Sequence, residues 1–166
     1  MDSIVAWAQR MKKSTGVVTT TRVTHASPAG CYAHIADRNW EWDAIITDTS
    51  EPCDDIALQL VRQAPGKDIN VVLGGGYAGF LPSQKTSWGG LKGQRRDQAD
   101  LLEEWMRHKT DQKKVASVVF NRTSLLNVDT KATEYLMGKI LTELCVFLGR
   151  SYVDYFKKDK NNFQDI

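Results

Sequence analysis

The sequence predicts an α/β fold in which a mostly parallel sheet carries helices on its faces. Stretches rich in β-branched residues alternate with helical patterns three times along the chain. This alternation is typical of parallel sheets, because a crossover between two parallel strands is usually made by a helix. The length of 166 residues fits one domain, and an apolar content of 42% is enough to form its core.

The first helix and strand of this pattern lie near the start of the chain. Residues 2–13 have helical spacing, and Asp2 or Ser3 is placed to cap the first turn by accepting a hydrogen bond from a free amide. Four apolar residues fall on one face of that helix: Ile4, Trp7, Ala8 and Met11. Residues 17–23 follow with many β-branched side chains, which favour a strand.

The alternation continues through two further helices to a second strand. Pro28 suits the first turn of a helix that we expect to extend to about Ala36, because the amide that proline lacks has no partner there. Residues 53–63 fit another helix, with three apolar residues turned inward: Ile56, Leu60 and Val61. Residues 68–76 then fit a short buried strand that ends in three glycines.

A polar, glycine-rich loop over residues 82–96 separates this strand from the last predicted elements. Residues 97–109 fit a helix with four apolar residues at its centre: Leu101, Leu102, Trp105 and Met106. Residues 113–123 return as a strand. Residues 136–149 are the most apolar segment; two charged residues interrupt it, so it fits a buried or partner-seeking helix and not a bilayer span, which takes about 20 apolar residues.

Charge and cysteine content exclude two classes of function. The net charge of +2 is nearly neutral and the basic runs are short, so we expect no nucleic-acid partner. The three cysteines, Cys31, Cys53 and Cys145, have no metal-ligand spacing. Because their number is odd, at least one thiol stays outside any disulfide within the chain.

Two short motifs each allow a structural and a functional explanation. Gly74–Gly76 follow a predicted strand and either bind phosphate through their backbone amides or form a tight turn. The turn is favoured, because no complete nucleotide-binding motif surrounds them. Asn121 begins an N-x-T motif, which is a glycosylation acceptor in a secreted protein.

His25, Ser27 and Arg38 are the candidate site residues. In an extended segment His25 and Ser27 point the same way; a serine hydroxyl suits Mg²⁺, and a guanidinium matches two phosphate oxygens. Alternatively, Ser27 caps the helix that begins at Pro28 and Arg38 is solvated at its far end. A helix of about nine residues would separate its ends by about 13 Å, so spacing alone favours the second explanation.

The sequence around these residues resembles the alkaline phosphatases of animals, of the membrane-anchored type. The resemblance covers about residues 2–138 and is carried by six blocks in the same order: KSTGVVTTTRVTHASPAGCYAHIADRNWE, CDDIALQLV, DINVVLGGG, LLEEWM, FNRTSLLNV and YLMG. It implies a three-layer α/β sandwich, of which this chain holds the central part. It also implies a homodimeric cell-surface glycoprotein that hydrolyses phosphomonoesters with zinc and magnesium.

The resemblance assigns a role to five residues of this chain. Arg38 corresponds to the arginine that binds two phosphate oxygens, His25 to a residue beside the magnesium and substrate, and Ser27 to a magnesium ligand. Asn121 corresponds to a glycosylation position. Cys53 corresponds to one half of a disulfide whose other half lies upstream of Met1.

Other parts of the family pattern are missing, so we expect a chain truncated at both ends. The nucleophilic serine has no counterpart, and three histidines are too few for two zinc ions. Residues 1–138 are then a partial catalytic domain, and residues 139–166 a divergent tail, helical and then disordered. Neither a signal peptide nor a membrane anchor is expected in the chain. The chain alone is expected to be inactive; the alternative is a non-catalytic surface glycoprotein or subunit-pairing module.

Overall fold

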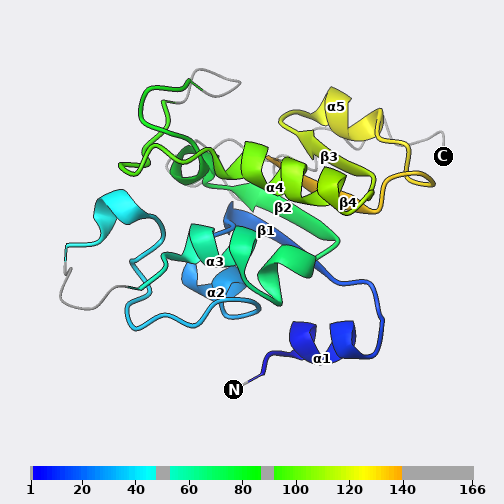
Figure 1. Ribbon diagram of the computed structural model, residues 1–166, viewed down its shortest axis with the longest axis horizontal. Helices are drawn as coiled ribbons and strands as arrows, with labels where there is room; N and C mark the ends of the chain where they lie inside the picture. Colours follow the sequence, from blue (N-terminus) through cyan, green and yellow to red (C-terminus); the bar gives the residue numbers. More distant parts are fainter. Residues whose placement is uncertain (1, 48–52, 87–91, 140–166) are drawn as a thin grey trace, which may run out of the picture.

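The computed structural model, which describes residues 2–47, 53–86 and 92–139, has an α/β architecture (Figure 1). In chain order its elements are α1 (Ile4–Arg10), β1 (Gly16–Arg22), α2 (Ala26–Ala29), the 3₁₀ turn η1 (Asp43–Ile45), α3 (Ile56–Arg62), η2 (Gly66–Asp68), β2 (Val71–Gly75), η3 (Tyr77–Phe80), α4 (Leu101–Asp111), β3 (Ala116–Val119), α5 (Arg122–Leu126) and β4 (Tyr135–Lys139).

The four strands of the described residues form one sheet in the order β1-β2-β4-β3. Every pairing in it is parallel, which confirms the predicted sheet type. The last strand, β4, enters between β2 and β3 and was expected to be part of a helix over 136–149. That prediction is wrong for residues 136–139, because a short strand buried in a parallel sheet is a continuous apolar run without alternation.

The remainder of the expected helix, and the expected tail beyond Lys139, fall on residues 140–166, outside the described residues. No helix of residues 2–47, 53–86 and 92–139 has the length and apolar character needed to cross a membrane.

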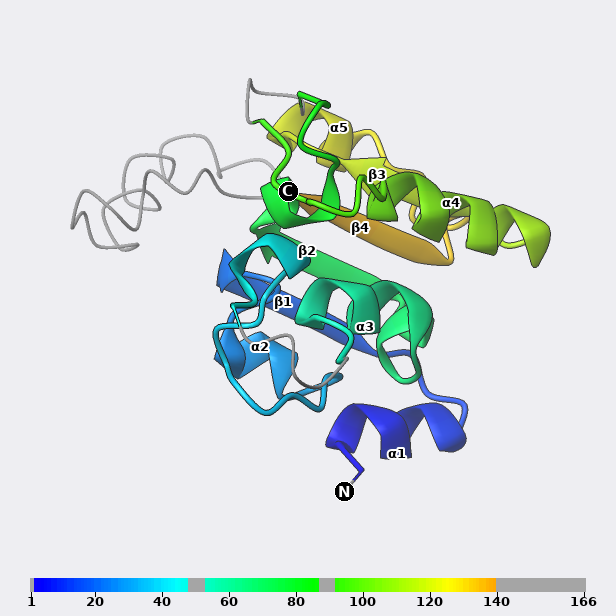
Figure 2. The ribbon, with the colours of Figure 1, turned by 60° about the vertical axis from the view of Figure 1, so that its left-hand side comes forward.

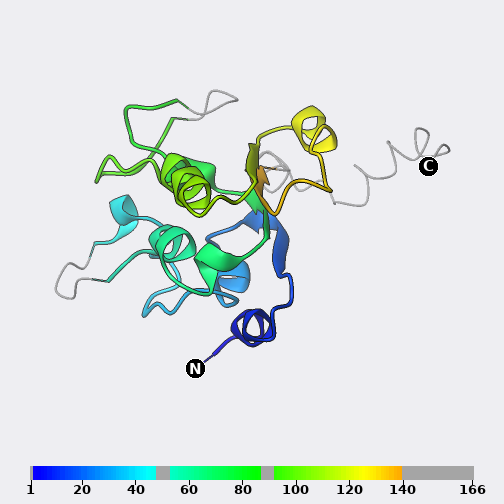
Figure 3. The same ribbon diagram turned by 45° about the vertical axis from the view of Figure 1, so that its right-hand side comes forward.

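One face of the sheet packs against α2, α3 and α4, while α5 lies on the opposite side (Figures 2 and 3). Val17, Val72 and Met137 are aligned in register across three strands and are buried on the helix-covered face. The predicted inward residues of α3 are fully or almost fully buried, and so are Leu101, Leu102 and Trp105 of α4. The burial of these apolar residues against one another is the main stabilising contribution to the fold.

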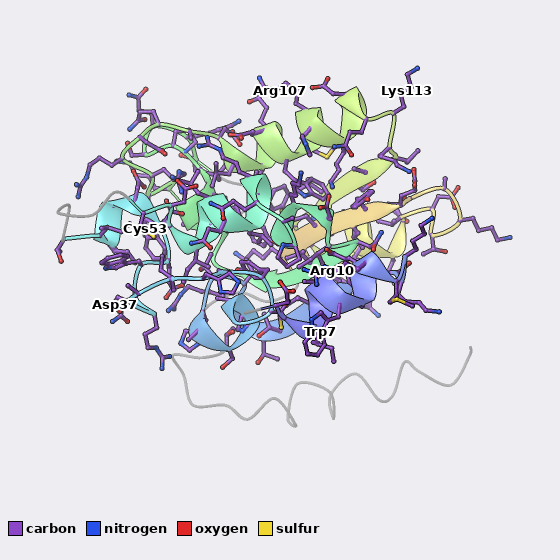
Figure 4. All side chains as sticks on the ribbon, turned by 60° about the horizontal axis from the view of Figure 1, so that its bottom comes forward. Trp7, Arg10, Asp37, Cys53, Arg107 and Lys113 are labelled. Carbon is purple, nitrogen blue, oxygen red and sulfur yellow. The ribbon has the colours of Figure 1, made fainter. Side chains whose placement is uncertain are left out.

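The apolar face of α1 does not pack on the described part of the molecule. Ser3 caps the helix, accepting a hydrogen bond from the Ala6 amide. Ile4, Trp7 and Met11, three of the four residues predicted to share one face, are 74%, 58% and 73% exposed, and Figure 4 shows Trp7 on the outer side of the helix. Val5 is instead the buried residue of α1. Helical spacing identified the apolar face correctly, but not whether that face is buried.

The three glycines after β2 are explained by contact with β1. A Cβ on Gly74 would lie 2.7 Å from the side chains of Thr19 and Val23. Gly76 has a φ of +87°, and a Cβ there would lie 2.7 Å from the Arg22 side chain. Close packing at Gly74 and a left-handed turn at Gly76 therefore account for two of the three glycines, which agrees with the turn that the sequence favoured.

Candidate functional site

The candidate residues lie where β1 ends, at the carboxyl edge of the parallel sheet. Ligands of open α/β sheets commonly bind at this edge. His25 follows β1 at the N-cap position of α2, and Ser27 lies inside that helix. The helix ends at Ala29, so the prediction that it extends to Ala36 is wrong. The chain turns back after this short helix, which brings Arg38 to His25.

Arg38 and His25 form a direct contact. Nη2 of Arg38 lies 3.4 Å from Nε2 of His25. Because a guanidinium only donates hydrogen bonds, Nε2 accepts in this contact and the proton of a neutral ring lies on Nδ1. The Nδ1 atom is buried and has no hydrogen-bond partner. The contact is long for a hydrogen bond and the Arg38 side chain is exposed, so most of its donors remain available to a ligand.

Ser27 does not cap the helix, which removes the alternative explanation of this residue. The N-cap residue is His25, and it makes no side-chain capping hydrogen bond. The Ser27 side chain is exposed, and its hydroxyl has no hydrogen-bond partner among the residues that the structure describes. Its hydroxyl oxygen is therefore available at the surface, two residues after His25.

A buried carboxylate lies next to the site. Glu41 is 5% exposed and accepts hydrogen bonds from Nε and Nη2 of Arg22, at 2.8 and 2.7 Å, and from the Thr24 hydroxyl, at 2.7 Å. Burial alone would raise the pKa of Glu41, but the hydrogen bonds from Arg22 and Thr24 outweigh it and hold the pKa below its usual value. Glu41 is therefore ionised at neutral pH.

A second buried side chain holds the segment between Ser27 and Arg38. The Gln59 side chain, on α3, accepts a hydrogen bond from the His34 amide at 2.8 Å and donates one to the His34 carbonyl at 3.0 Å. The backbone of His34 is thus fixed, while its ring lies at the surface, as expected for an ordinary surface histidine. Neither Glu41 nor Gln59 was predicted from the sequence. The available signal for Glu41 was a charged residue between two tryptophans, Trp40–Glu41–Trp42.

The described residues do not form a complete magnesium or zinc site. Across residues 2–47, 53–86 and 92–139, no group of three His, Cys, Asp or Glu side chains is placed to hold a metal ion. Ser27 offers one hard oxygen, which fits a single position around Mg²⁺. Any further ligands would have to come from outside the described residues.

Two other predicted residues lie away from this site. The Asn121 side chain is exposed and caps α5, accepting a hydrogen bond from the Ser124 amide at 2.8 Å. Cys53 is exposed and its thiol is free in the described structure. The exposure of Asn121 is compatible with glycosylation and the free thiol of Cys53 with pairing to a distant cysteine, but both roles remain predictions.

The family model described as "Alkaline phosphatase" matches residues 1–142. The membrane-bound alkaline phosphatase of Bombyx mori is 41% identical over 141 residues, which cover 83% of this chain and 26% of the relative. Alkaline phosphatase 4 of Drosophila melanogaster is 43% identical, with coverages of 83% and 25%. The human alkaline phosphatase, tissue-nonspecific isozyme, is 41% identical, with coverages of 82% and 27%. The chain therefore spans about a quarter of the length of these relatives.

Proposed function

Because the chain belongs to the alkaline phosphatase family, we propose that it supplies the phosphate-binding arginine of a phosphomonoester hydrolase. The observation that carries the proposal is the exposed Arg38 guanidinium, held against His25 at the carboxyl edge of the sheet. A planar guanidinium donates two parallel hydrogen bonds to a phosphate, and its charge stabilises the negative charge of the phosphoryl group during transfer. Arg38 would bind and orient the ester.

His25 and Ser27 have supporting roles in this proposal. Nε2 of His25 would accept from Arg38 and limit the rotation of its guanidinium, and the ring would face the bound ester. Ser27 would donate its free hydroxyl oxygen to Mg²⁺, and zinc, when bound, would supply the activated water of the family reaction. The nucleophile and the zinc ligands are expected from parts of the relatives that this chain does not match, so we expect no turnover by the chain alone.

The first experiment measures the binding of inorganic phosphate to the purified chain. We expect saturable binding, followed by the Arg38 Nε–H cross-peak in ¹H–¹⁵N spectra. Binding should be lost in Arg38→Ala and weakened in Arg38→Lys, which keeps the charge but not the paired donors. Arg107→Ala is the matched control, because Arg107 is another exposed arginine, on α4 (Figure 4). Equal phosphate affinity in Arg38→Ala and Arg107→Ala would refute the proposed role of Arg38.

The second experiment measures hydrolysis of a chromogenic phosphomonoester at alkaline pH with zinc and magnesium. The expected result is no turnover above that of a buffer blank. Turnover that is abolished by Arg38→Ala would show that the chain alone is active and would contradict the expectation.

A second candidate function, a surface module that pairs with a complete subunit, is favoured by the exposed apolar face of α1. Ile4, Trp7 and Met11 are exposed on it, and Val18 of the edge strand β1 is 66% exposed. The name of the membrane-bound relative supports a membrane or cell-surface location, and the exposed Asn121 supports a glycoprotein. Co-purification of the chain with a full-length alkaline phosphatase, lost in Trp7→Asp, is the expected result; no co-purification would exclude this function.

A further inference from the structure

We propose that Glu41 is a positioning residue that holds Arg38 in place for phosphate binding. The inference rests on the function proposed above, because it assigns to Glu41 a role in the same site. Glu41 would not touch the phosphate. It acts through the two chain segments that carry Arg38 and His25.

The Glu41 carboxylate connects these two segments directly. Thr24, which donates to Oε2 of Glu41 at 2.7 Å, is the residue before His25. Arg22, which donates to both carboxylate oxygens, also accepts a backbone hydrogen bond from His25, at 3.0 Å to its carbonyl oxygen. Glu41 itself lies three residues after Arg38. The end of β1 and the following loop are thus joined at two points. One is the Glu41 carboxylate, and the other is the Arg38–His25 contact.

The short connection between Arg38 and Glu41 is itself well ordered by hydrogen bonds. The Asp37 side chain accepts from the Asn39 amide at 2.8 Å, and the Asp37 carbonyl accepts from the Trp40 amide at 3.1 Å. The Trp40 and Glu41 carbonyls accept from the first two amides of α3, at 3.0 and 3.1 Å. Because this segment is ordered, a shift in the position of Glu41 would also shift Arg38.

Within residues 2–47, 53–86 and 92–139, the Arg38 side chain has no short contact to fix it. Its one partner there is the His25 ring, at 3.4 Å, and the side chain is exposed. In contrast, Glu41 and Thr24 are 5% and 0% exposed, and the three hydrogen bonds to the Glu41 carboxylate have lengths of 2.7 to 2.8 Å. The geometry of the exposed arginine thus depends on the buried carboxylate beneath it.

The test compares Glu41→Gln with Glu104→Gln in the full chain. Glu104 is the matched control, because its carboxylate also accepts a bidentate arginine contact, from Arg62 at 2.8 and 2.9 Å. That contact joins α3 to α4 and lies outside the candidate site. The first measurement is the affinity for inorganic phosphate. We expect the Kd to rise about three- to tenfold in Glu41→Gln, because the Arg38 side chain then has to be ordered on binding, and to stay unchanged in Glu104→Gln.

The second measurement is the ¹⁵Nε order parameter of Arg38 without phosphate, at a temperature where urea denaturation shows each variant to be folded. We expect it to fall in Glu41→Gln alone, and to recover in part in Glu41→Asp, which restores the charge. A general loss of stability would not produce this selective change. An Arg38 order parameter that is the same in both Gln variants would overturn the inference.

The two readouts separate this inference from the proposed function. If the unmodified chain does not bind phosphate, the proposed function fails, and the order parameter alone decides whether Glu41 positions Arg38. If phosphate binds but Glu41→Gln and Glu104→Gln have equal affinities and equal Arg38 order, the function stands and the role of Glu41 is refuted.

Discussion

Two arginines of this chain, Arg95 and Arg38, have opposite surroundings. Arg95 is 0% exposed, and its guanidinium donates to the carboxylates of Asp55 and Asp97 and to the Gly79 carbonyl. Arg38 is exposed and, within the described part of the chain, its side chain has one long contact, to Nε2 of His25. Arg95 has its donors occupied by the protein, whereas Arg38 has most of its donors free.

The difference separates an arginine that stabilises the fold from one whose donors are available to a ligand. The Arg95 cluster joins three segments: the loop of residues 92–100, the N-terminus of α3, which Asp55 caps, and η3 through Gly79. A buried charge is tolerated only when it is paired, and here two carboxylates pair with it. Arg38 links no buried segments in the described structure, so its donors are available for the phosphate binding proposed above.

The largest expected effect is the loss of Arg95. Replacement by leucine leaves the Asp55 and Asp97 carboxylates without their buried partner, and such a loss costs about 3–5 kcal/mol of unfolding free energy. Urea denaturation followed by circular dichroism measures the change. Arg107→Leu, at an exposed position, is the control and should stay within about 0.5 kcal/mol of the unmodified chain. Equal stabilities of the two variants would contradict the structural role of Arg95.

Lys109 provides a buried cation that has no carboxylate partner among the residues that the structure describes. Its ammonium donates to the Lys67 carbonyl at 2.5 Å and lies 3.7 Å from the ring centroid of Tyr135. Burial lowers the pKa of Lys109. Lys109→Ala removes the hydrogen bond, the cation–π contact and the buried stem, so we expect a loss of about 2–3 kcal/mol in urea denaturation.

The length-conserving variant Lys109→Met separates these contributions. It keeps most of the buried volume, so its unfolding free energy should fall by about 1 kcal/mol less than that of Lys109→Ala. If the alanine variant is as stable as the unmodified chain, removal of the buried Lys109 cation does not lower the unfolding free energy. The stabilising role of Arg95 would then be due to its carboxylate partners alone.

The elements that could be predicted from sequence are those with a long, clear pattern. In α3 and α4 the apolar residues recur at helical spacing and are buried as predicted. The end of α2 was missed, because it depends on tertiary contact. The Tyr32 side chain, just beyond Gly30, is buried and donates a hydrogen bond to the Val23 carbonyl at 2.6 Å, which draws the chain back to β1. Such a contact has no periodic signal.

The same reason limits prediction of the site. The sequence pointed to His25, Ser27 and Arg38 by residue type and by resemblance, but spacing placed the last two at opposite ends of a helix. Their segment instead folds back because Glu41 and Gln59 hold it, and both are polar residues that sequence patterns would assign to the surface. Buried polar residues that organise a loop are visible only in the fold.

A smaller effect is expected from the pH dependence of Glu41. Its pKa in the folded chain lies below the ordinary value of 4.5, so the folded state binds fewer protons than the unfolded state in the window below pH 4.5. This contribution to stability is fully present above that window and is lost as the pH falls through the lowered pKa. Glu41→Gln lacks it. Urea denaturation at pH 6, 4.5 and 3 gives the unfolding free energies of the unmodified chain and of Glu41→Gln. The difference between these two free energies should become smaller toward pH 3.

The smallest expected effect on stability is that of Arg38→Ala. An exposed side chain with one long contact contributes little, so the unfolding free energy should change by less than about 0.5 kcal/mol. Urea denaturation and phosphate titration of the same sample give the decisive pair of values: stability retained and phosphate binding lost. A loss of stability comparable with that of Arg95→Leu would instead make Arg38 a structural arginine, and the distinction between the two would no longer hold.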